Sequence, residues 1–429
     1  MATGSGKTIT ALNCLLENYK EDGFYRAIIL VPSIPLLDQW KLEVKKFSYN
    51  DILIAGGGND WERDFASYVS KYSWGNRQNL IIVCTYGTFI TDKFQKYFNK
   101  VGEDFMLIAD EAHNMASKSI RQVLPQIKSK RLIGLSATPK RIYDVEGTEV
   151  LNSFFDDAPP YTYEFSIKEA INEGFLSEYK YYPKVVELNQ AEMHDYIDIS
   201  KRLLKFFDFE KGEFRNDPIV EILMLKRKNI IHKAQNKIIQ FKEILSEIVQ
   251  NRKLKYAFTF VPEGLDSNNV RLIDLYIKAG AETIPELKMN SYTSEDDSPS
   301  EILRGFTDGK IDMLYAMKML DEGIDIPRAE IGIFCSSTGN PRQFIQRRGR
   351  LLRKHPEKSY ALIYDMIVVP NTAIKTSEYF AMERNLVKKE LQRVAHFASL
   401  SMNFYDSKRN LEFVLEKYDL NMDQIISEL

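Results

Sequence analysis

Two short stretches decide the fold, Ala2-Thr3-Gly4-Ser5-Gly6-Lys7-Thr8 and Met106-Leu107-Ile108-Ala109-Asp110-Glu111. The first is a glycine-rich turn that leads into an amphipathic stretch, Ile9–Tyr19, which we expect to be helical. Glycines at such a place let backbone N–H groups turn inward around phosphate oxygens, and the start of the helix adds its dipole. The turn therefore predicts a phosphate-binding loop, although the usual pattern has a further glycine where this chain has Met1. A plain glycine-rich turn before a helix is the alternative.

Each polar residue of the loop has an expected task. The Lys7 ammonium would reach the β- and γ-phosphates of a nucleotide, and the Thr8 hydroxyl would bind Mg²⁺. The residues expected to hold the nucleotide are Thr3, Gly4, Ser5, Gly6, Lys7 and Thr8.

The second stretch is an apolar run that ends in two acids. The carboxyl ends of parallel strands are where α/β sheets bind their ligands. Asp110 is suited to hold Mg²⁺ through water, and Glu111 is suited to orient and deprotonate an attacking water molecule. Alternatively, both acids cap the helix that follows. With a phosphate loop upstream, the pair favours a nucleoside triphosphatase.

Apolar runs rich in β-branched residues alternate with amphipathic stretches, which is typical of βαβ units around a parallel sheet. In the first half we expect strands at Ala27–Val31, Leu80–Cys84, Phe105–Ala109 and Arg131–Leu135. In the second half we expect them at Tyr256–Phe260, Asp312–Ala316, Glu330–Phe334 and Tyr360–Tyr364. The sequence thus predicts an α/β first lobe (1–165), a mostly helical linker or insert (166–250), a second α/β lobe (251–370) and a helical C-terminal extension (371–429).

Composition limits the possible partners. The 58 basic and 60 acidic side chains leave a formal charge of −2, so any polyanion must meet a local basic groove. The three cysteines have neither zinc-ligand nor disulfide spacing, and no apolar run is long enough to cross a membrane. We therefore expect a cytoplasmic protein without a membrane contact.

Further motifs follow in a fixed order. They are Val31-Pro32-Ser33, Thr85-Tyr86-Gly87, Asp110-Glu111-Ala112-His113, Ser136-Ala137-Thr138, Asp321-Glu322-Gly323-Ile324-Asp325-Ile326-Pro327 and Gln346-Arg347-Arg348-Gly349-Arg350-Leu351-Leu352-Arg353. In this order, over residues 2 to about 365, the set resembles helicase superfamily 2. The motif sequences are most similar to those of XPB-like and restriction-associated bacterial helicases. The four residues 110–113 are that superfamily's DEAH box.

The resemblance implies a P-loop NTPase with two RecA-like lobes, an ATP- and Mg²⁺-dependent helicase or translocase. Its expected substrate is DNA, and RNA is the alternative because such motifs contact the backbone and do not distinguish the sugar. It implies that Arg350 and Arg353 are arginine fingers, that Gln346 senses the γ-phosphate, and that Asp325 lies near the ribose. It assigns coupling between nucleotide state and lobe closure to His113, Ser136 and Thr138, and nucleic-acid contacts to Ser33 and Thr85. Lys140 and Arg141 are equally well nucleic-acid contacts or solvated charges, and Arg347 and Arg348 are structural or solvated.

The chain departs from the family at its start. Members of the superfamily carry a strand and an adenine-recognising segment before the phosphate loop, and neither precedes Ala2 here. Either the protein begins further upstream or it lacks the strand and binds ATP poorly. Two other functions stay open. One is a non-catalytic nucleic-acid-binding or scaffold subunit. The other is the motor of a restriction or defence complex whose nuclease is a partner, since residues 371–429 hold no nuclease-like cluster of carboxylates and lysine.

Overall fold

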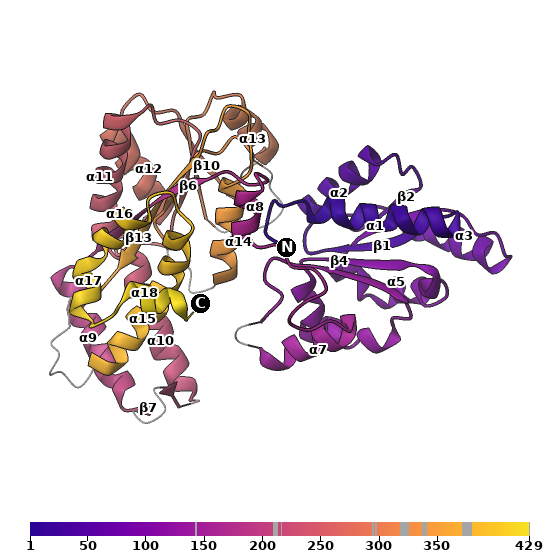
Figure 1. Cartoon of the computed structure of the whole chain (residues 1–429), viewed down its shortest axis with the longest axis horizontal. Helices are drawn as coiled ribbons and strands as arrows, with labels where there is room; N and C mark the ends of the chain where they lie inside the picture. Colours follow the sequence, from indigo (N-terminus) through magenta and orange to yellow (C-terminus); the bar gives the residue numbers. More distant parts are fainter. Residues whose placement is uncertain are drawn as a thin grey trace. The chain divides into compact units, whose positions relative to one another are not determined.

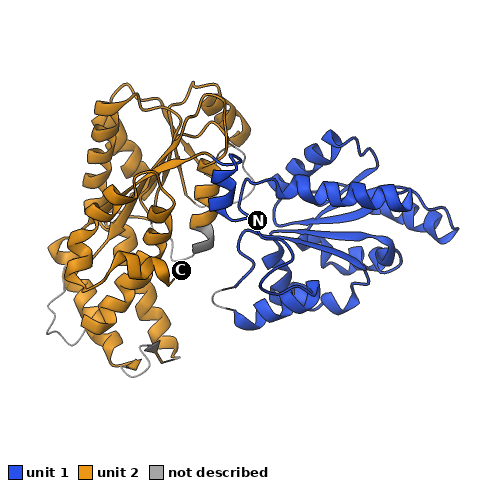
Figure 2. Cartoon of the chain, viewed as in Figure 1, with its two compact units in different colours: residues 1–176, 321–325 blue, residues 177–320, 326–429 orange. Residues whose placement is uncertain are grey.

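The computed structural model describes residues 1–141, 144–208, 213–215, 217–293, 296, 298–317, 326–336, 341–370 and 380–428. These residues form two compact units (Figure 2). Unit 1 comprises the described residues of 1–176, and unit 2 comprises all the described residues from Ser177 onward. Each unit is built around its own parallel sheet.

Unit 1 contains five parallel strands in the order β2-β3-β1-β4-β5 (Figure 1). Their bounds are Ile52–Ala55 for β2, Leu80–Thr85 for β3, Arg26–Val31 for β1, Met106–Asp110 for β4 and Arg131–Leu135 for β5. β1, at the centre, is buried at all of its positions, because side chains that alternate along a central strand enter the core on both faces of the sheet.

Helices cover both faces of this sheet. Ala27, Ile29 and Val31 of β1 face α1 (Lys7–Asp22) and α2 (Ile34–Lys46). Ile28 and Leu30 face the other side of the sheet, where they pack with most of the other helices of the unit. These are α3 (Glu62–Ser73), α4 (Tyr86–Phe89), α5 (Asp92–Phe98), η2 (Ala112–Ala116), α6 (Lys118–Arg121) and α7 (Val145–Phe155), while η1 (Gly102–Asp104), η3 (Leu124–Gln126) and α8 (Ile167–Asn172) complete the unit.

Unit 2 contains six parallel strands in the order β10-β11-β9-β12-β13-β6. They are β10 (Met289–Tyr292), β11 (Met313–Ala316), β9 (Ala257–Phe260), β12 (Ile331–Phe334), β13 (Ala361–Val368) and β6 (Tyr179–Val186). One face packs on α11 (Asn236–Asn251) and α12 (Leu272–Thr283). On the opposite face a row of rings joins Phe260, Phe334, Phe344 and Phe397, and so links the sheet to α14 (Pro341–Leu351) and α15 (Phe380–Ser399).

The rest of unit 2 is mainly helical. A small core formed by Leu203, Leu223 and Met382 joins α9 (Gln190–Leu204), α10 (Pro218–Lys233) and α15. The other elements are the antiparallel pair β7 (Phe207–Asp208) and β8 (Glu213–Phe214), α13 (Pro299–Thr307), α16 (Phe404–Asn410), α17 (Glu412–Lys417) and α18 (Met422–Ser427).

All eight predicted strands form, with ends shifted by a few residues, and the predicted first helix runs from Lys7 to Asp22. The segment 166–250 is not the separate helical linker that its charge pattern suggested. Its residues Tyr179–Val186 form β6, which pairs along its full length with β13. Tyr179 and Tyr181 are buried while Lys180 between them is half-buried, and Pro183 is tolerated because β6 is an edge strand. The border between the units therefore falls after Leu176 instead of residue 165.

Two further strands of the parallel sheets, β2 and β10, were not predicted. Each has only four residues and lies at a sheet edge, so its pattern is too short to separate from a loop. The C-terminal extension is helical over residues 380–428, as expected, but it is part of unit 2 and not an appendage. Phe397 of α15 is a core residue at 1% exposure, whereas Tyr405 is 80% exposed.

Candidate nucleotide and nucleic-acid site

The loop before α1 has the backbone that its glycines predict. Gly4 and Gly6 have φ angles of 82° and 95°, in the left-handed region that other residues rarely adopt. The loop is anchored by hydrogen bonds from the Ala2 N–H to the Phe165 carbonyl (2.7 Å) and from the Ser5 hydroxyl to the Ala2 carbonyl (2.7 Å). A Cβ on Gly6 would meet nothing within 4 Å, so backbone conformation, not space, requires glycine there.

The loop fits an anionic ligand. The Lys7 Nζ and Thr3 Oγ1 atoms are buried, and neither has a hydrogen-bond partner among the described residues. A buried ammonium without a partner is costly, and a phosphate group would satisfy it. Thr8 is half-buried in the first turn of α1, a helix of 16 residues, so its hydroxyl lies where a helix N-terminus favours an anion and its metal.

Asp110 lies at the carboxyl end of β4 and is buried. Its Oδ2 accepts a hydrogen bond from the Trp40 indole N–H (2.8 Å), and its Oδ1 accepts one from the Glu111 N–H (3.0 Å). Burial raises the pKa of Asp110, while the Trp40 hydrogen bond and the charge of Lys7 act in the opposite direction. The predicted ammonium and carboxylate of the site are therefore close enough to interact in unit 1.

Glu111 has a left-handed backbone, with φ 47° and ψ 55°, which is unusual outside glycine and is often retained at functional sites. Its Oε2 lies 3.4 Å from the Nδ1 atom of His113. The alternative that the two acids cap the next helix is not what the structure shows. Glu111 precedes η2 without a side-chain capping bond, and the Asp110 carboxylate accepts from the indole instead.

The segment after β5 is hydrogen-bonded to the residues that follow the end of β4, where Asp110 and Glu111 lie. The Ser136 hydroxyl accepts a hydrogen bond from the Thr138 N–H (3.1 Å). Farther on, the Arg141 guanidinium donates to the His113 carbonyl (2.6 Å) and to Asp144 (2.8 Å). Arg141 is thus a structural link and not a solvated charge, whereas Lys140 is exposed.

Arg121 and Asp144 complete this link and were not predicted from the sequence. Arg121 donates to both carboxylate oxygens of Asp144, each at 2.9 Å, and Asp144 also caps α7 by accepting from the Gly147 N–H. The only signal in the sequence was Asp144 three residues before Gly147, a possible N-cap.

The two predicted nucleic-acid contacts stand at the starts of helices. Ser33 is the N-cap residue of α2, but its hydroxyl makes no capping bond and is buried without a partner among the described residues. Thr85 caps α4, because its hydroxyl accepts from the Thr88 N–H (3.2 Å). Both residues lie at the carboxyl ends of β1 and β3, the edge of the sheet that also carries Asp110.

In unit 2, α14 carries Gln346 and Arg350, and Arg353 follows two residues after the end of the helix. Gln346 is buried at 5% exposure, and Arg350 and Arg353 are half-buried. Arg347 and Arg348 are buried rather than solvated, and the Arg348 guanidinium lies 3.7 Å from the centroid of the Phe397 ring. Asp325, with the rest of residues 321–325, lies outside the described residues.

Lys358 is a second residue that the sequence did not single out. Its ammonium donates to the carbonyls of Pro327 (3.1 Å), Ala329 (3.0 Å) and Leu351 (3.0 Å). It thereby joins the end of α14 to the segment before β12. A lone lysine after a motif gives no signal of this contact.

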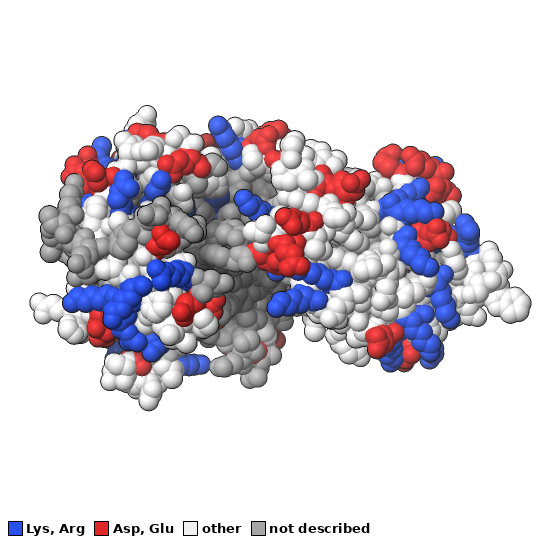
Figure 3. Space-filling model, turned by 90° about the horizontal axis from the view of Figure 1, so that it is seen from below, with Lys and Arg blue, Asp and Glu red and all other residues white. Residues whose placement is uncertain are grey.

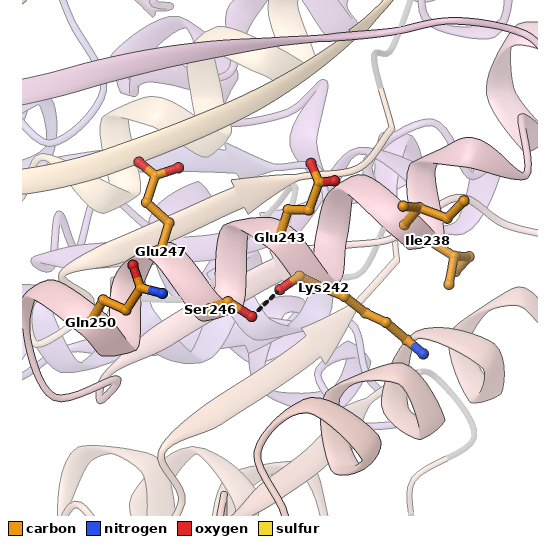
Figure 4. Close-up of a pocket in the computed structure, with 7 residues that line it drawn as sticks. Ile238, Lys242, Glu243, Ser246, Glu247 and Gln250 are labelled. Atoms are coloured by element: carbon orange, nitrogen blue, oxygen red, sulfur yellow. Dashed lines mark hydrogen bonds between the residues drawn. The ribbon is translucent and has the colours of Figure 1, made fainter.

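The hollow drawn in Figure 4 lies away from the predicted site residues along the chain. It runs along the outer side of α11 in unit 2 and is lined by Ile238, Ile239, Lys242, Glu243, Ser246, Glu247 and Gln250. None of these is a predicted site residue. On the face seen in Figure 3, basic and acidic side chains occur in small interspersed groups, in keeping with the nearly balanced charge. Among the described residues, no helix is both long and apolar enough to span a membrane.

Two family descriptions match the chain. Residues 1–141 match "Type III restriction enzyme, res subunit", and residues 267–355 match "Helicase conserved C-terminal domain". The first match holds the phosphate loop and the DEAH box, and the second ends at the predicted arginine fingers.

Curated relatives agree with these matches. A DNA 3'-5' translocase XPB2 of Sulfurisphaera tokodaii is 27% identical over 390 residues, which cover 86% of this chain and 76% of that protein. The Type I restriction enzyme EcoAI endonuclease subunit of Escherichia coli is 31% identical over 188 residues, 42% of this chain and 20% of that protein.

Solved structures share the fold. The Type ISP restriction-modification enzyme LlaBIII bound to DNA matches with a TM-score of 0.61 at 16% identity, over 98% of this chain and 30% of that one. The Pyrococcus furiosus Hef helicase domain matches with a TM-score of 0.51 at 14% identity, over 85% and 91%. The two sheets are thus RecA-like lobes, as in these solved structures. The two domain matches place the chain among the helicases of superfamily 2. Within that superfamily, its sequence is similar to XPB-like and restriction-associated proteins.

Proposed function

We propose that the chain is an ATP-dependent translocase or helicase that acts on DNA. The observation that carries the proposal is the buried Lys7 ammonium at the start of a long helix, which has no hydrogen-bond partner among the described residues. Its charge acts on the buried Asp110 carboxylate at the end of a parallel strand. Relatives with related sequences are named as a DNA 3'-5' translocase and a putative DNA 3'-5' helicase. These names favour DNA over RNA and movement driven by nucleotide.

In this proposal unit 1 binds and cleaves ATP. Backbone N–H groups of the loop and the Lys7 ammonium hold the phosphates, with Thr3, Gly4, Ser5 and Gly6 shaping the loop. Thr8 and Asp110 would hold Mg²⁺, which neutralises charge on the phosphates when bound. Glu111 orients the attacking water and takes its proton. His113, next to Glu111, is suited to sense its state, and Ser136 and Thr138 relay the change to the loop that Arg141 secures.

Unit 2 would supply the arginines. Arg350 and Arg353 stabilise the charge that develops on the transferred phosphoryl group, and Gln346 senses the γ-phosphate. Asp325 would lie near the ribose. Because parts of one site come from two lobes, ATP favours a closed state and hydrolysis releases it. A strand held at Ser33 and Thr85 is then moved along, by contacts to its backbone that are weakly specific for sequence and sensitive to salt.

We further propose a cytoplasmic protein whose partner is a nuclease or another subunit of a restriction or defence complex. The support is the family match of residues 1–141 and the restriction-enzyme relatives. The exposed side chains of Met402, in the turn before α16, of Tyr405 on α16 and of Phe413 on α17 are available for such an association. Co-purification of the chain with proteins encoded beside it would test this part separately.

The test is steady-state ATP hydrolysis with duplex DNA, single-stranded DNA or RNA. We expect weak basal turnover that DNA raises strongly, and a loss of 10²- to 10⁴-fold in Glu111→Gln, the range typical of a general base. Glu103→Gln, which alters an exposed carboxylate of the same unit, is the matched control and should retain turnover. A folded chain that binds DNA but hydrolyses no more ATP than Glu111→Gln would instead be a non-catalytic nucleic-acid-binding or scaffold subunit.

A further inference from the structure

Asp110 is held from three directions inside unit 1. Its two carboxylate oxygens accept from Trp40 (2.8 Å) and from the Glu111 N–H (3.0 Å), and its own carbonyl accepts from the Tyr86 hydroxyl (2.8 Å). Each carboxylate oxygen can accept two hydrogen bonds, so one position on each remains for water or a metal ion. The side chain can therefore hold a hydrated cation only in the orientation that these donors fix.

The Trp40 donor belongs to the element that begins at a predicted nucleic-acid contact. Trp40 lies on α2, seven positions after the N-cap residue Ser33. Seven positions are close to two helical turns, so Ser33 and Trp40 lie on the same side of the helix. Trp40 is 1% exposed and packs with Leu37 and Val44, which fixes the direction of its indole N–H.

The Tyr86 donor follows directly on the other predicted contact. Tyr86 is the first residue of α4, whose N-cap is Thr85. Tyr86 is buried, and its hydroxyl reaches the main chain at the end of β4 although 24 residues separate the two in sequence. Both elements that begin at a predicted nucleic-acid contact thus donate a hydrogen bond to Asp110.

We infer that Trp40 and Tyr86 are positioning residues for the metal-binding carboxylate, and that they transmit contact of DNA at the starts of α2 and α4 to Asp110. This inference rests on the proposed function of the same site. A small movement of either helix would rotate the Asp110 carboxylate or shift the end of β4, because rigid packed elements move as units. DNA binding would then adjust the geometry of the hydrated cation.

A buried tryptophan needs an acceptor for its N–H in any core, so a purely structural contact has to be distinguished from a positioning one. Trp40→Phe keeps an aromatic ring in the core and removes only the donor. Trp61→Phe is the matched control, because Trp61 lies in the same unit against Phe65 and Phe94. Tyr86→Phe removes the second donor.

The first readout is the binding of ATP at a series of Mg²⁺ concentrations, measured by titration calorimetry in a Glu111→Gln background so that turnover does not interfere. We expect the Mg²⁺ concentration for half-maximal binding to rise about 10-fold in Trp40→Phe, since loss of a partner that orients a metal ligand costs 10- to 100-fold in affinity or activity. Trp61→Phe should match the parent. Equal Mg²⁺ dependence in Trp40→Phe and Trp61→Phe, both folded by circular dichroism, would overturn the positioning role.

The second readout is the ratio of DNA-stimulated to basal ATP turnover in chains that retain Glu111. Trp40→Phe and Tyr86→Phe should each lower this ratio several-fold at saturating Mg²⁺, and an unchanged ratio would overturn the transmission role. If the parent shows no DNA-stimulated turnover, the proposed function fails, whereas the Mg²⁺ dependence of ATP binding still decides the role of Trp40. A parent that binds no ATP at any Mg²⁺ concentration would overturn both.

Discussion

Arg348 is a guanidinium buried in the core of unit 2, with its face against the ring of Phe397 and its NH1 atom 3.5 Å from the Tyr179 hydroxyl. Burial lowers its pKa, yet an arginine stays charged under any ordinary condition. A desolvated contact between a cation and a ring contributes about 2 kcal/mol, which offsets part of the cost of burial. The positive charge of Arg348 also acts on the imidazole of His396.

His396 should make unit 2 sensitive to acid. Burial, and next the charge of Arg348, lower the pKa of His396 from about 6.5 to about 4. The folded state therefore binds fewer protons than the unfolded state between pH 4 and 6.5, and the free energy of unfolding must fall as the pH drops through this window. The expected contribution is roughly 1–3 kcal/mol, reduced from the full shift because the side chain is only partly buried.

Urea unfolding at several pH values checks this prediction. His396→Gln should lose less stability than the parent between pH 6.5 and 4, and His194→Gln, a change to an exposed histidine of α9, should follow the parent. Parallel pH profiles for the parent and His396→Gln would show that the imidazole is not the cause.

At the scale of elements, α15 supports α14, the helix that carries Arg350 and ends two residues before Arg353. Phe397 contacts Phe344 of α14 with ring centroids 4.5 Å apart, and the Tyr179 hydroxyl of β6 donates to the Phe397 carbonyl. The C-terminal extension is therefore part of the packing of α14.

Phe397→Ala should destabilise unit 2 by about 3–5 kcal/mol, the usual cost of removing a buried aromatic ring. It should also lower ATP turnover, because α14 positions Arg350. Phe413→Ala on α17, where the ring is 63% exposed, should change stability by less than about 0.5 kcal/mol. Unfolding midpoints in urea and steady-state turnover measure the two effects. Equal stability of the two variants would contradict a core role for α15.

At the scale of the whole molecule, each of the apolar clusters of described residues lies within one unit. The clusters around β1 contain residues of unit 1, and the clusters around β12 and α9 contain residues of unit 2. Since cooperative unfolding follows a shared core, we expect two calorimetric transitions.

Phe94→Ala in unit 1 and Phe241→Ala in unit 2 remove fully buried rings and should each lower a different transition by roughly 10 °C. Scanning calorimetry at several scan rates measures this, and the rates show whether the transitions are reversible. A single transition that both variants shift equally would mean that the two units unfold as one.

The sequence by itself determined the features that depend on neighbours along the chain. The glycines at Gly4 and Gly6 dictate the loop because only glycine readily adopts their φ angles. Apolar runs predicted the buried strands, and the acids at the end of one run predicted where Asp110 and Glu111 would lie. The order of the motifs indicated the superfamily, which the domain matches then bore out.

Only the tertiary structure decided the contacts between distant segments. Trp40 and Asp110 are 70 residues apart, Arg141 and His113 are 28 apart, and β6 pairs with β13 across most of unit 2. Spacing along a chain fixes which residues share a helix face or a strand edge, but it does not fix which helix covers which strand. That choice follows from packing all apolar faces together at once, and it is the reason that the partners of Asp110, His113 and Arg348 appear only in the folded chain.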